Sequence, residues 1–194
     1  MRAPPFPPAD MPDDLRPLHD EMTGYVERHL KGFVSRRDDG ALVGPFPAML
    51  RFPAFGRAVW NLTKVMIDNT KLPKPAHEVA ILVTGAAFNA RYELYAHERV
   101  AAGVGLSAEK IATITAGERP ADLTEEERCA YDVAATLAGG RQLPDSTYHR
   151  SVEVFGEEQT GELIYLVGAY LLVSTLLNAF DVSVPGREEG LPND

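Results

Sequence analysis

The sequence predicts an all-α protein of about eight helices. Apolar residues recur at three- and four-residue steps through most of the chain, and no segment shows a sustained alternation of β-branched residues. Signals that start and stop helices recur through the second half. With 194 residues, of which 45% are hydrophobic, the chain can bury a sizeable core. We expect one helical domain over residues 14–184, between a proline-rich arm (1–13) and an irregular tail (185–194).

The amino-acid composition argues against several classes of function. Nineteen basic against 28 acidic residues give a net charge of -9, which argues against non-specific nucleic-acid binding. A single cysteine, Cys129, excludes an intrachain disulfide or a CxxC pair and fits a reducing compartment. The first residues lack the apolar segment of a signal peptide, and no uninterrupted apolar run approaches membrane-spanning length. We expect a cytoplasmic protein with no nucleic-acid or membrane partner.

The arm is expected to be extended and poorly ordered unless it docks on the domain. Residues 15–34 then carry an apolar face at helical spacing, which predicts one amphipathic helix. Arg36 and Arg37 suit its last turn, where cations complement the helix dipole, and Gly40 ends it.

Residues 41–53 form the next segment. Three prolines and a glycine preclude a long helix there, so we expect a loop. The segment is too apolar to be a solvated linker, and two interpretations are open. Either it closes the core, or it forms the roof of a pocket.

Helical spacing resumes over residues 54–68, and a turn leads into a helix over 75–88. Pro75 suits the first turn of that helix, where its missing N–H costs nothing. Asn89 and Ala90 predict a break before another helix over 91–102. Residues 107–116 and 124–138 follow, the latter opened by a capping box between Thr124 and Glu127.

The last helical segments are predicted over residues 146–155 and 159–180. Gly156 is expected to separate them, because glycine favours a break in a helix.

The stretch over residues 75–105 carries the candidate chemistry. It holds the longest apolar run of the chain, followed directly by polar and aromatic residues, a pattern typical of a buried site. The candidate residues are Glu78, Arg91, Tyr92, Glu93, Tyr95 and His97.

Glu93 and His97 are four residues apart, so on a helix they share a face. Such a pair holds an imidazole in one tautomer and raises its pKa, which suits acid–base work near neutral pH. If the chain folds back at Asn89, Glu78 reaches the same imidazole. The alternative is an exposed ion pair worth less than about 1 kcal/mol.

Other chemistries are less well supported. The ExxxH spacing lacks a third metal ligand, so we expect no metal. His19, His29, His77 and His149 stand singly on predicted helices, and we expect no catalytic role for them. Cys129 lies within a helix and is expected to be a small buried hydrophobe.

The stretch resembles the carboxymuconolactone decarboxylase family, to which the alkylhydroperoxidase D-like proteins belong. The resemblance covers residues 44–184, and its central match is Glu78 with ILVTGAAFNA, then YELYAHERVAAGVGLSAEKI. Peroxidase members of that family carry a Glu, a CxxC pair and a His. Glu78 and His97 match the Glu and the His, but the cysteine positions are Ala90 and Glu93. Thiol peroxidase activity is therefore disfavoured.

The resemblance implies an alkylhydroperoxidase D-like helical bundle and a decarboxylase that acts on a small carboxylated lactone without a cofactor. His97 would be the general acid–base, with Glu78 and Glu93 to orient it. The residues expected to bind substrate are Arg91, Tyr92 and Tyr95, with Pro45 and Phe46 in the pocket roof. Family members also form trimers or hexamers, so we expect a homo-oligomer. A non-catalytic, ligand-binding member of the superfamily is the alternative.

Overall fold

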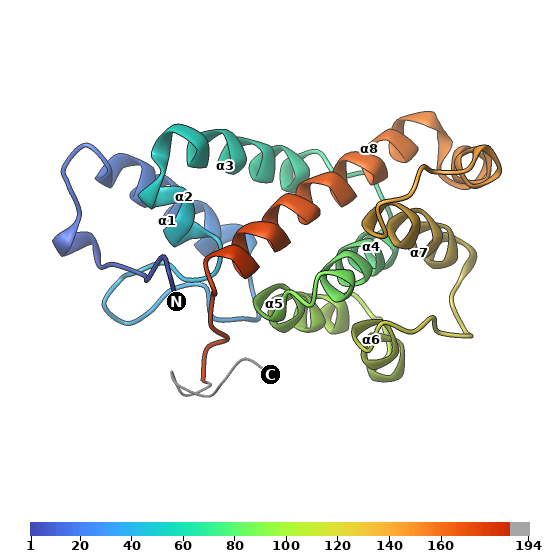
Figure 1. Cartoon of the computed structure of the whole chain (residues 1–194), viewed down its shortest axis with the longest axis horizontal. Helices are drawn as coiled ribbons and strands as arrows, with labels where there is room; N and C mark the ends of the chain where they lie inside the picture. Colours follow the sequence, from blue (N-terminus) through green and yellow to red (C-terminus); the bar gives the residue numbers. More distant parts are fainter. Residues whose placement is uncertain (187–194) are drawn as a thin grey trace.

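The computed structural model describes residues 1–186, which form eight α helices, one 3₁₀ turn (η1, Pro8–Asp10) and no strand (Figure 1). The helices are α1 (Arg16–His29), α2 (Phe46–Arg51), α3 (Pro53–Asp68), α4 (Lys74–Ala87), α5 (Arg91–Gly103), α6 (Ala108–Thr115), α7 (Glu125–Ala138) and α8 (Asp145–Ala179). The all-α prediction is therefore confirmed. The predicted tail lies outside the described residues from position 187 onward.

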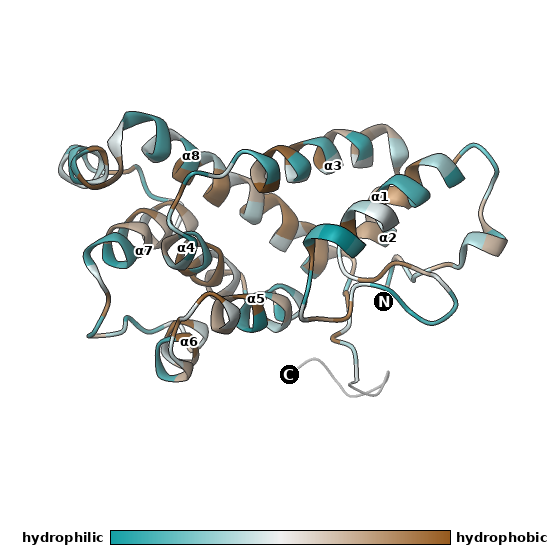
Figure 2. Ribbon diagram, turned by 180° about the vertical axis from the view of Figure 1, so that it is seen from behind, coloured by the Kyte–Doolittle hydropathy of each residue, from teal (hydrophilic) through white to brown (hydrophobic). Residues whose placement is uncertain are grey.

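Helix α4 is the centre of the larger core. It packs against α5, α6, α7 and α8, and its residues 79–82 are completely buried. A helix that is apolar on all sides is stable only when other elements cover it. Figure 2 shows hydrophobic stretches of ribbon along α8 and around α4.

A second, smaller core forms between α1, α2 and α3. Its centre is Trp60, which is 1% exposed and packs edge-on against Tyr25 and Phe46. The indole N–H donates to Glu21, so the only polar atom of this ring is satisfied. Figure 1 shows this group of helices at one end of the molecule and α4–α7 at the other, with α8 running along both.

The proline-rich arm docks on the domain. The backbone N–H of Arg2 donates to the carbonyl of Phe180, and the terminal amine of Met1 pairs with Asp181. Ala3 and Met11 are buried. The arm is therefore held against the domain by these contacts.

The first helix is shorter than predicted. It ends at His29 rather than near residue 37, and Gly32 follows with a φ of 91°, a conformation that glycine adopts without steric cost. Arg36 pairs with Glu27 and forms an isolated bridge with Leu42. After the end of the helix, Phe33 packs with Tyr92 and Ala96 of α5, whereas Val34 is 45% exposed.

The apolar segment 41–53 is not only a loop, because it contains the short helix α2. Gly44 precedes this helix with a φ of 78°, and a Cβ at that position would lie 2.5 Å from the ring of Tyr92. Only glycine allows this close approach between the segment and α5.

Several predicted boundaries are confirmed. Pro75 lies in the first turn of α4, and α7 begins with the capping box between Thr124 and Glu127. Gly156 has a φ of 82° inside α8, so the two predicted last helices are joined across a kink.

Helix α8 is long and apolar enough to cross a membrane by length and composition alone, since an 18-residue window within it has a mean hydropathy of 1.6. Its apolar residues are interrupted by polar ones, so no uninterrupted apolar run marks it in the sequence. The same helix supplies Leu163, Leu166 and Val167 to the core, and 39% of its apolar window is buried. Tyr165 and Leu172 lie on its exposed side.

Candidate functional site

The turn between α4 and α5 assembles the site. Asn89 has a φ of 48°, in the left-handed region that asparagine tolerates better than most residues, and the N–H of Ala90 donates to the carbonyl of Gly85. The chain reverses there, so α5 packs back against α4. This brings His97 beside Glu78, nineteen residues earlier.

The imidazole of His97 lies between two carboxylates. Its Nδ1 is 2.8 Å from Oε2 of Glu78, and its Nε2 is 3.1 Å from Oε1 of Glu93. The two glutamates are buried, at 5% and 4% exposure. The alternative of an exposed surface ion pair is therefore wrong.

The carboxylates of Glu78 and Glu93 control the protonation state of His97, and we call these three residues the cluster. Burial by itself lowers the pKa of His97, but the charges of Glu78 and Glu93 and the hydrogen bonds to them outweigh burial and raise it to about 10. Burial alone raises the pKa of Glu78, but the cationic His97 and the hydrogen bonds from His77 and His97 lower it to about 2. At neutral pH the cluster therefore holds an imidazolium with both N–H groups donated to carboxylates.

This charge state changes the expected role of His97. A pKa near neutrality, as expected from the spacing, would leave a nitrogen free to accept a proton. The imidazolium has no free nitrogen, which disfavours His97 as a general base.

Glu93 retains an oxygen for a ligand. Its Oε1 contacts His97, whereas its Oε2 has no hydrogen bond among the described residues. Within the same residues, Ser174 Oγ is the only fully buried side-chain polar atom without a partner. Glu93 lines the adjoining cavity.

That cavity has a volume of about 350 Å³ and lies between the two cores. Its floor includes Glu78, Glu93 and His97, and its walls are mainly apolar. The apolar wall residues include Phe33, Met49, Met66, Ile67 and Val173. Such a cavity suits a compact organic ligand with a few polar groups.

Pro45 and Phe46 also line the cavity, and Phe46 belongs to the smaller core as well. The segment 41–53 thus closes the core and covers the cavity at once. Tyr92 lines the same cavity, and its hydroxyl donates to the carbonyl of Val34 at 2.8 Å. Burial raises the pKa of Tyr92, so it stays a donor.

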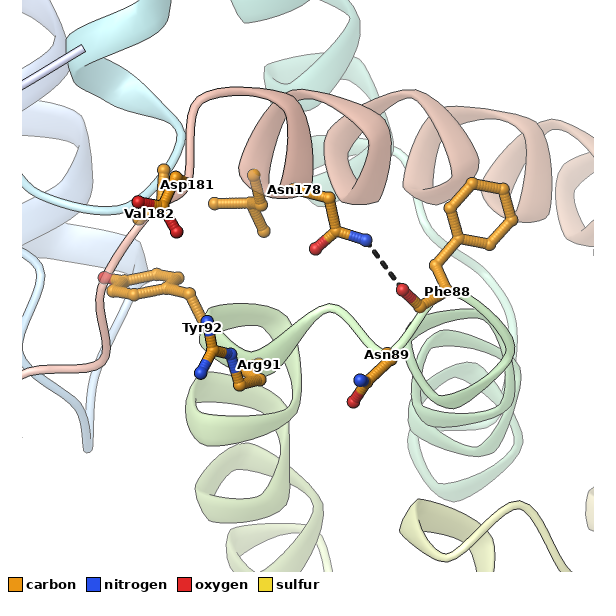
Figure 3. Close-up of a pocket in the computed structure, with 8 residues that line it drawn as sticks. Phe88, Asn89, Arg91, Tyr92, Asn178, Asp181 and Val182 are labelled. Carbon is orange, nitrogen blue, oxygen red and sulfur yellow. Dashed lines mark hydrogen bonds between the residues drawn. The ribbon is translucent and has the colours of Figure 1, made fainter. Parts of the chain in front are cut away.

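Arg91 and Tyr95 lie elsewhere. Arg91 lines a second, more polar cavity of about 270 Å³ between the start of α5 and the end of α8, with Asn89, Asn178 and Asp181 (Figure 3). The ring of Tyr95 packs under Arg99, with 4.0 Å between the guanidinium carbon and the ring centroid. Neither residue lines the cavity at His97, so the structure does not bring them to the predicted site.

Two residues at the cavity were missed from the sequence. His77 Nδ1 lies 3.2 Å from the second oxygen of Glu78, and Tyr170 on α8 packs edge-on against His97 with 5.2 Å between ring centroids. Burial, then Glu93 and Glu78, raise the pKa of the Tyr170 hydroxyl well above its usual value. The adjacency of His77 to Glu78 was a usable signal, but nothing local connected Tyr170 to the cluster.

Neither Ala90 nor Glu93 carries a thiol, and the buried Cys129 does not line the cavity. Residues 1–186 contain no cluster of three or more His, Cys, Asp or Glu side chains arranged to hold a metal ion.

Solved structures share this architecture. An uncharacterized peroxidase-related protein with an alkylhydroperoxidase AhpD core, from Ralstonia eutropha JMP134, has a TM-score of 0.72 at 15% identity, covering 95% of this chain and 92% of that chain. The chain has an AhpD-like fold. A cysteine-to-alanine variant of the debrominase Bmp8, in complex with 2,3,4-tribromopyrrole, also has a TM-score of 0.72, at 18% identity, covering 96% of this chain and 92% of that one.

The apo form of Bmp8 gives a TM-score of 0.71 at 15% identity, over 91% of this chain and 90% of that chain. No family model and no curated protein matches the sequence. At these identities the likeness establishes the AhpD-like fold, while the site of this chain has to be interpreted from its own residues.

Proposed function

We propose that this AhpD-like protein is an acid–base enzyme of the carboxy-lyase type that acts on a small carboxylated lactone such as γ-carboxymuconolactone. The observation that supports it most is the free oxygen of Glu93 at the floor of a mainly apolar cavity, beside the cation of His97. The substrate class rests on the resemblance of residues 75–105 to the carboxymuconolactone decarboxylase family.

The proposed reaction needs one proton at one carbon. An anionic ligand beside Glu93 favours proton uptake on Glu93 Oε2, because like charges disfavour the ionised carboxylate. The C–CO₂⁻ bond then breaks, CO₂ leaves, and the electron pair enters the lactone as a dienolate. Glu93 donates its proton to a carbon of the dienolate and becomes a carboxylate again beside His97. The next proton comes from solvent.

His97 and Glu78 have supporting roles in this scheme. The imidazolium stabilises the negative charge of the dienolate, and Glu78 keeps it charged and oriented. Tyr92 and Tyr170 supply the neutral aromatic surroundings. The reported complex of Bmp8 with tribromopyrrole, a compact planar molecule, supports a ligand of similar size here.

A ligand-binding member without catalysis is the second candidate. It is favoured by the saturation of both His97 nitrogens, which leaves the histidine no proton to exchange without breaking an ion pair. Thiol peroxidase chemistry is disfavoured in either case, because Ala90 and Glu93 replace the cysteines.

The ultraviolet absorbance of γ-carboxymuconolactone tests the proposal. We expect the full chain to consume it with release of one CO₂ per turnover, with and without a metal chelator. If the absorbance does not change while the compound binds saturably, the lyase proposal is wrong and the ligand-binding alternative is supported.

We also propose that the protein is a homo-oligomer. The resemblance to a family of trimers and hexamers supports this proposal, and the candidate contacts are Phe55 on α3 and Tyr165 on α8, which are 77% and 71% exposed. Phe55→Glu is expected to reduce the mass measured by light scattering toward the 21.2 kDa of one chain. Ala102→Glu, which adds the same charge to an exposed position of α5, should leave the oligomer intact. A wild-type mass of one chain would contradict the proposal.

A further inference from the structure

We propose that Lys74 and His77, on the first turn of α4, form a carboxylate-binding subsite at the cavity. This inference rests on the proposed function. It identifies the side chains that would hold the carboxylate that does not react. γ-Carboxymuconolactone carries two carboxylates, one of which leaves as CO₂. The subsite would bind the other.

The positions of the two side chains carry the argument. Lys74 and His77 both line the cavity, and residues three apart on a helix share a face. Lys74 makes no side-chain hydrogen bond or ion pair with any described residue. His77 uses Nδ1 to contact Glu78, and its Nε2 has no partner among the residues described.

Two of the other basic groups that line the cavity already have polar partners. His97 is paired with two carboxylates, and the ammonium of Lys31 donates to the carbonyl of Glu27. His29 stacks on Tyr25, with 4.2 Å between ring centroids. Arg91, which the sequence suggested for this role, lines the other cavity.

The spacing fits a ligand of one small ring. At 1.5 Å per residue, Lys74 lies roughly 6 Å along the axis of α4 from Glu78. Glu78 and Glu93 contact the two nitrogens of His97, and Glu93 and Lys74 line one cavity, so a lactone with its reacting carbon at Glu93 would direct its side-chain carboxylate toward the start of α4. The positive end of the helix dipole adds to the attraction there.

Benzoate and benzamide are matched probes for this subsite, because they are nearly the same shape and differ in charge. We expect the full-length wild-type protein to bind benzoate about tenfold more tightly than benzamide, because the carboxylate of benzoate can accept a charge-assisted hydrogen bond from Lys74. Lys74→Met should abolish this preference. His77→Asn should weaken it while keeping a donor to Glu78. Dissociation constants from calorimetry or NMR titration give the readout.

Lys31→Met and Arg91→Gln are the controls, since each removes a cation that the subsite does not use. Equal affinity for the two probes, binding of neither, or an unchanged preference in Lys74→Met would overturn the proposal. The binding experiment needs no turnover, so a protein that binds benzoate through Lys74 but does not convert the lactone would refute only the lyase function. If the lactone is converted, Lys74→Met should raise KM about tenfold with kcat nearly unchanged, because the retained carboxylate is held equally throughout the reaction.

Discussion

Replacement of Glu93 by glutamine is expected to lower kcat for the lactone by a factor of about 10² to 10⁴, the usual range for loss of a positioned acid or base. Glutamine has nearly the same shape but cannot give up a proton from the position of Oε2. The fold should persist, because His97 keeps its 2.8 Å contact with Glu78. Steady-state rates together with circular dichroism spectra separate these two effects.

Glu98→Gln provides the matched control. It removes the same charge from the same helix, but Glu98 does not line the cavity. Wild-type turnover by Glu93→Gln would show that Glu93 does not transfer the proton. Equal losses in both variants would indicate a general effect of charge.

Replacement of His97 by glutamine is expected to lower the free energy of unfolding at pH 7 by about 3–5 kcal/mol, as when one partner of a buried ion pair is removed. The physical reason is that Glu78 and Glu93 are then left as two buried carboxylates without a cation. The loss should be smaller in acid, where the carboxylates take up protons. Urea unfolding at several pH values measures it.

The wild-type pH profile provides an independent check. The pKa of His97 rises from 6.5 unfolded to about 10 folded, so its contribution is complete below pH 6.5 and is lost as pH rises toward 10. The pKa of Glu78 falls from 4.5 to about 2, so its contribution is complete above pH 4.5 and is lost as pH falls toward 2. The cluster therefore stabilises the fold most between pH 4.5 and 6.5.

In His97→Gln the decline between pH 6.5 and 10 should disappear, because the imidazole held between Glu78 and Glu93 is absent. His149→Gln, at an exposed position of α8, should retain it. If the wild type shows no decline over this range, His97 is not held as a cation.

The helical fold was predictable because its signals are local. The spacing of apolar residues in α4, the capping box at Thr124 and the break at Gly156 each depend on a few neighbouring residues. The end of α1 was not predictable in the same way. Its apolar pattern continues past His29, but the chain turns at Gly32 and Phe33 packs with residues of α5, a contact between distant parts of the sequence.

The sequence by itself determined the all-α class, the pairing of Glu93 with His97 on one helix face, and the absence of thiols at Ala90 and Glu93. Only the tertiary structure decided that His97 is a buried cation, because its charge depends on Glu78 arriving from another helix and on the exclusion of water. It also placed Arg91 in a different cavity and left Lys74 beside the site. The spacing of residues shows which side chains are neighbours on one helix. The burial and the charge of a side chain depend on neighbours from every helix that packs around it.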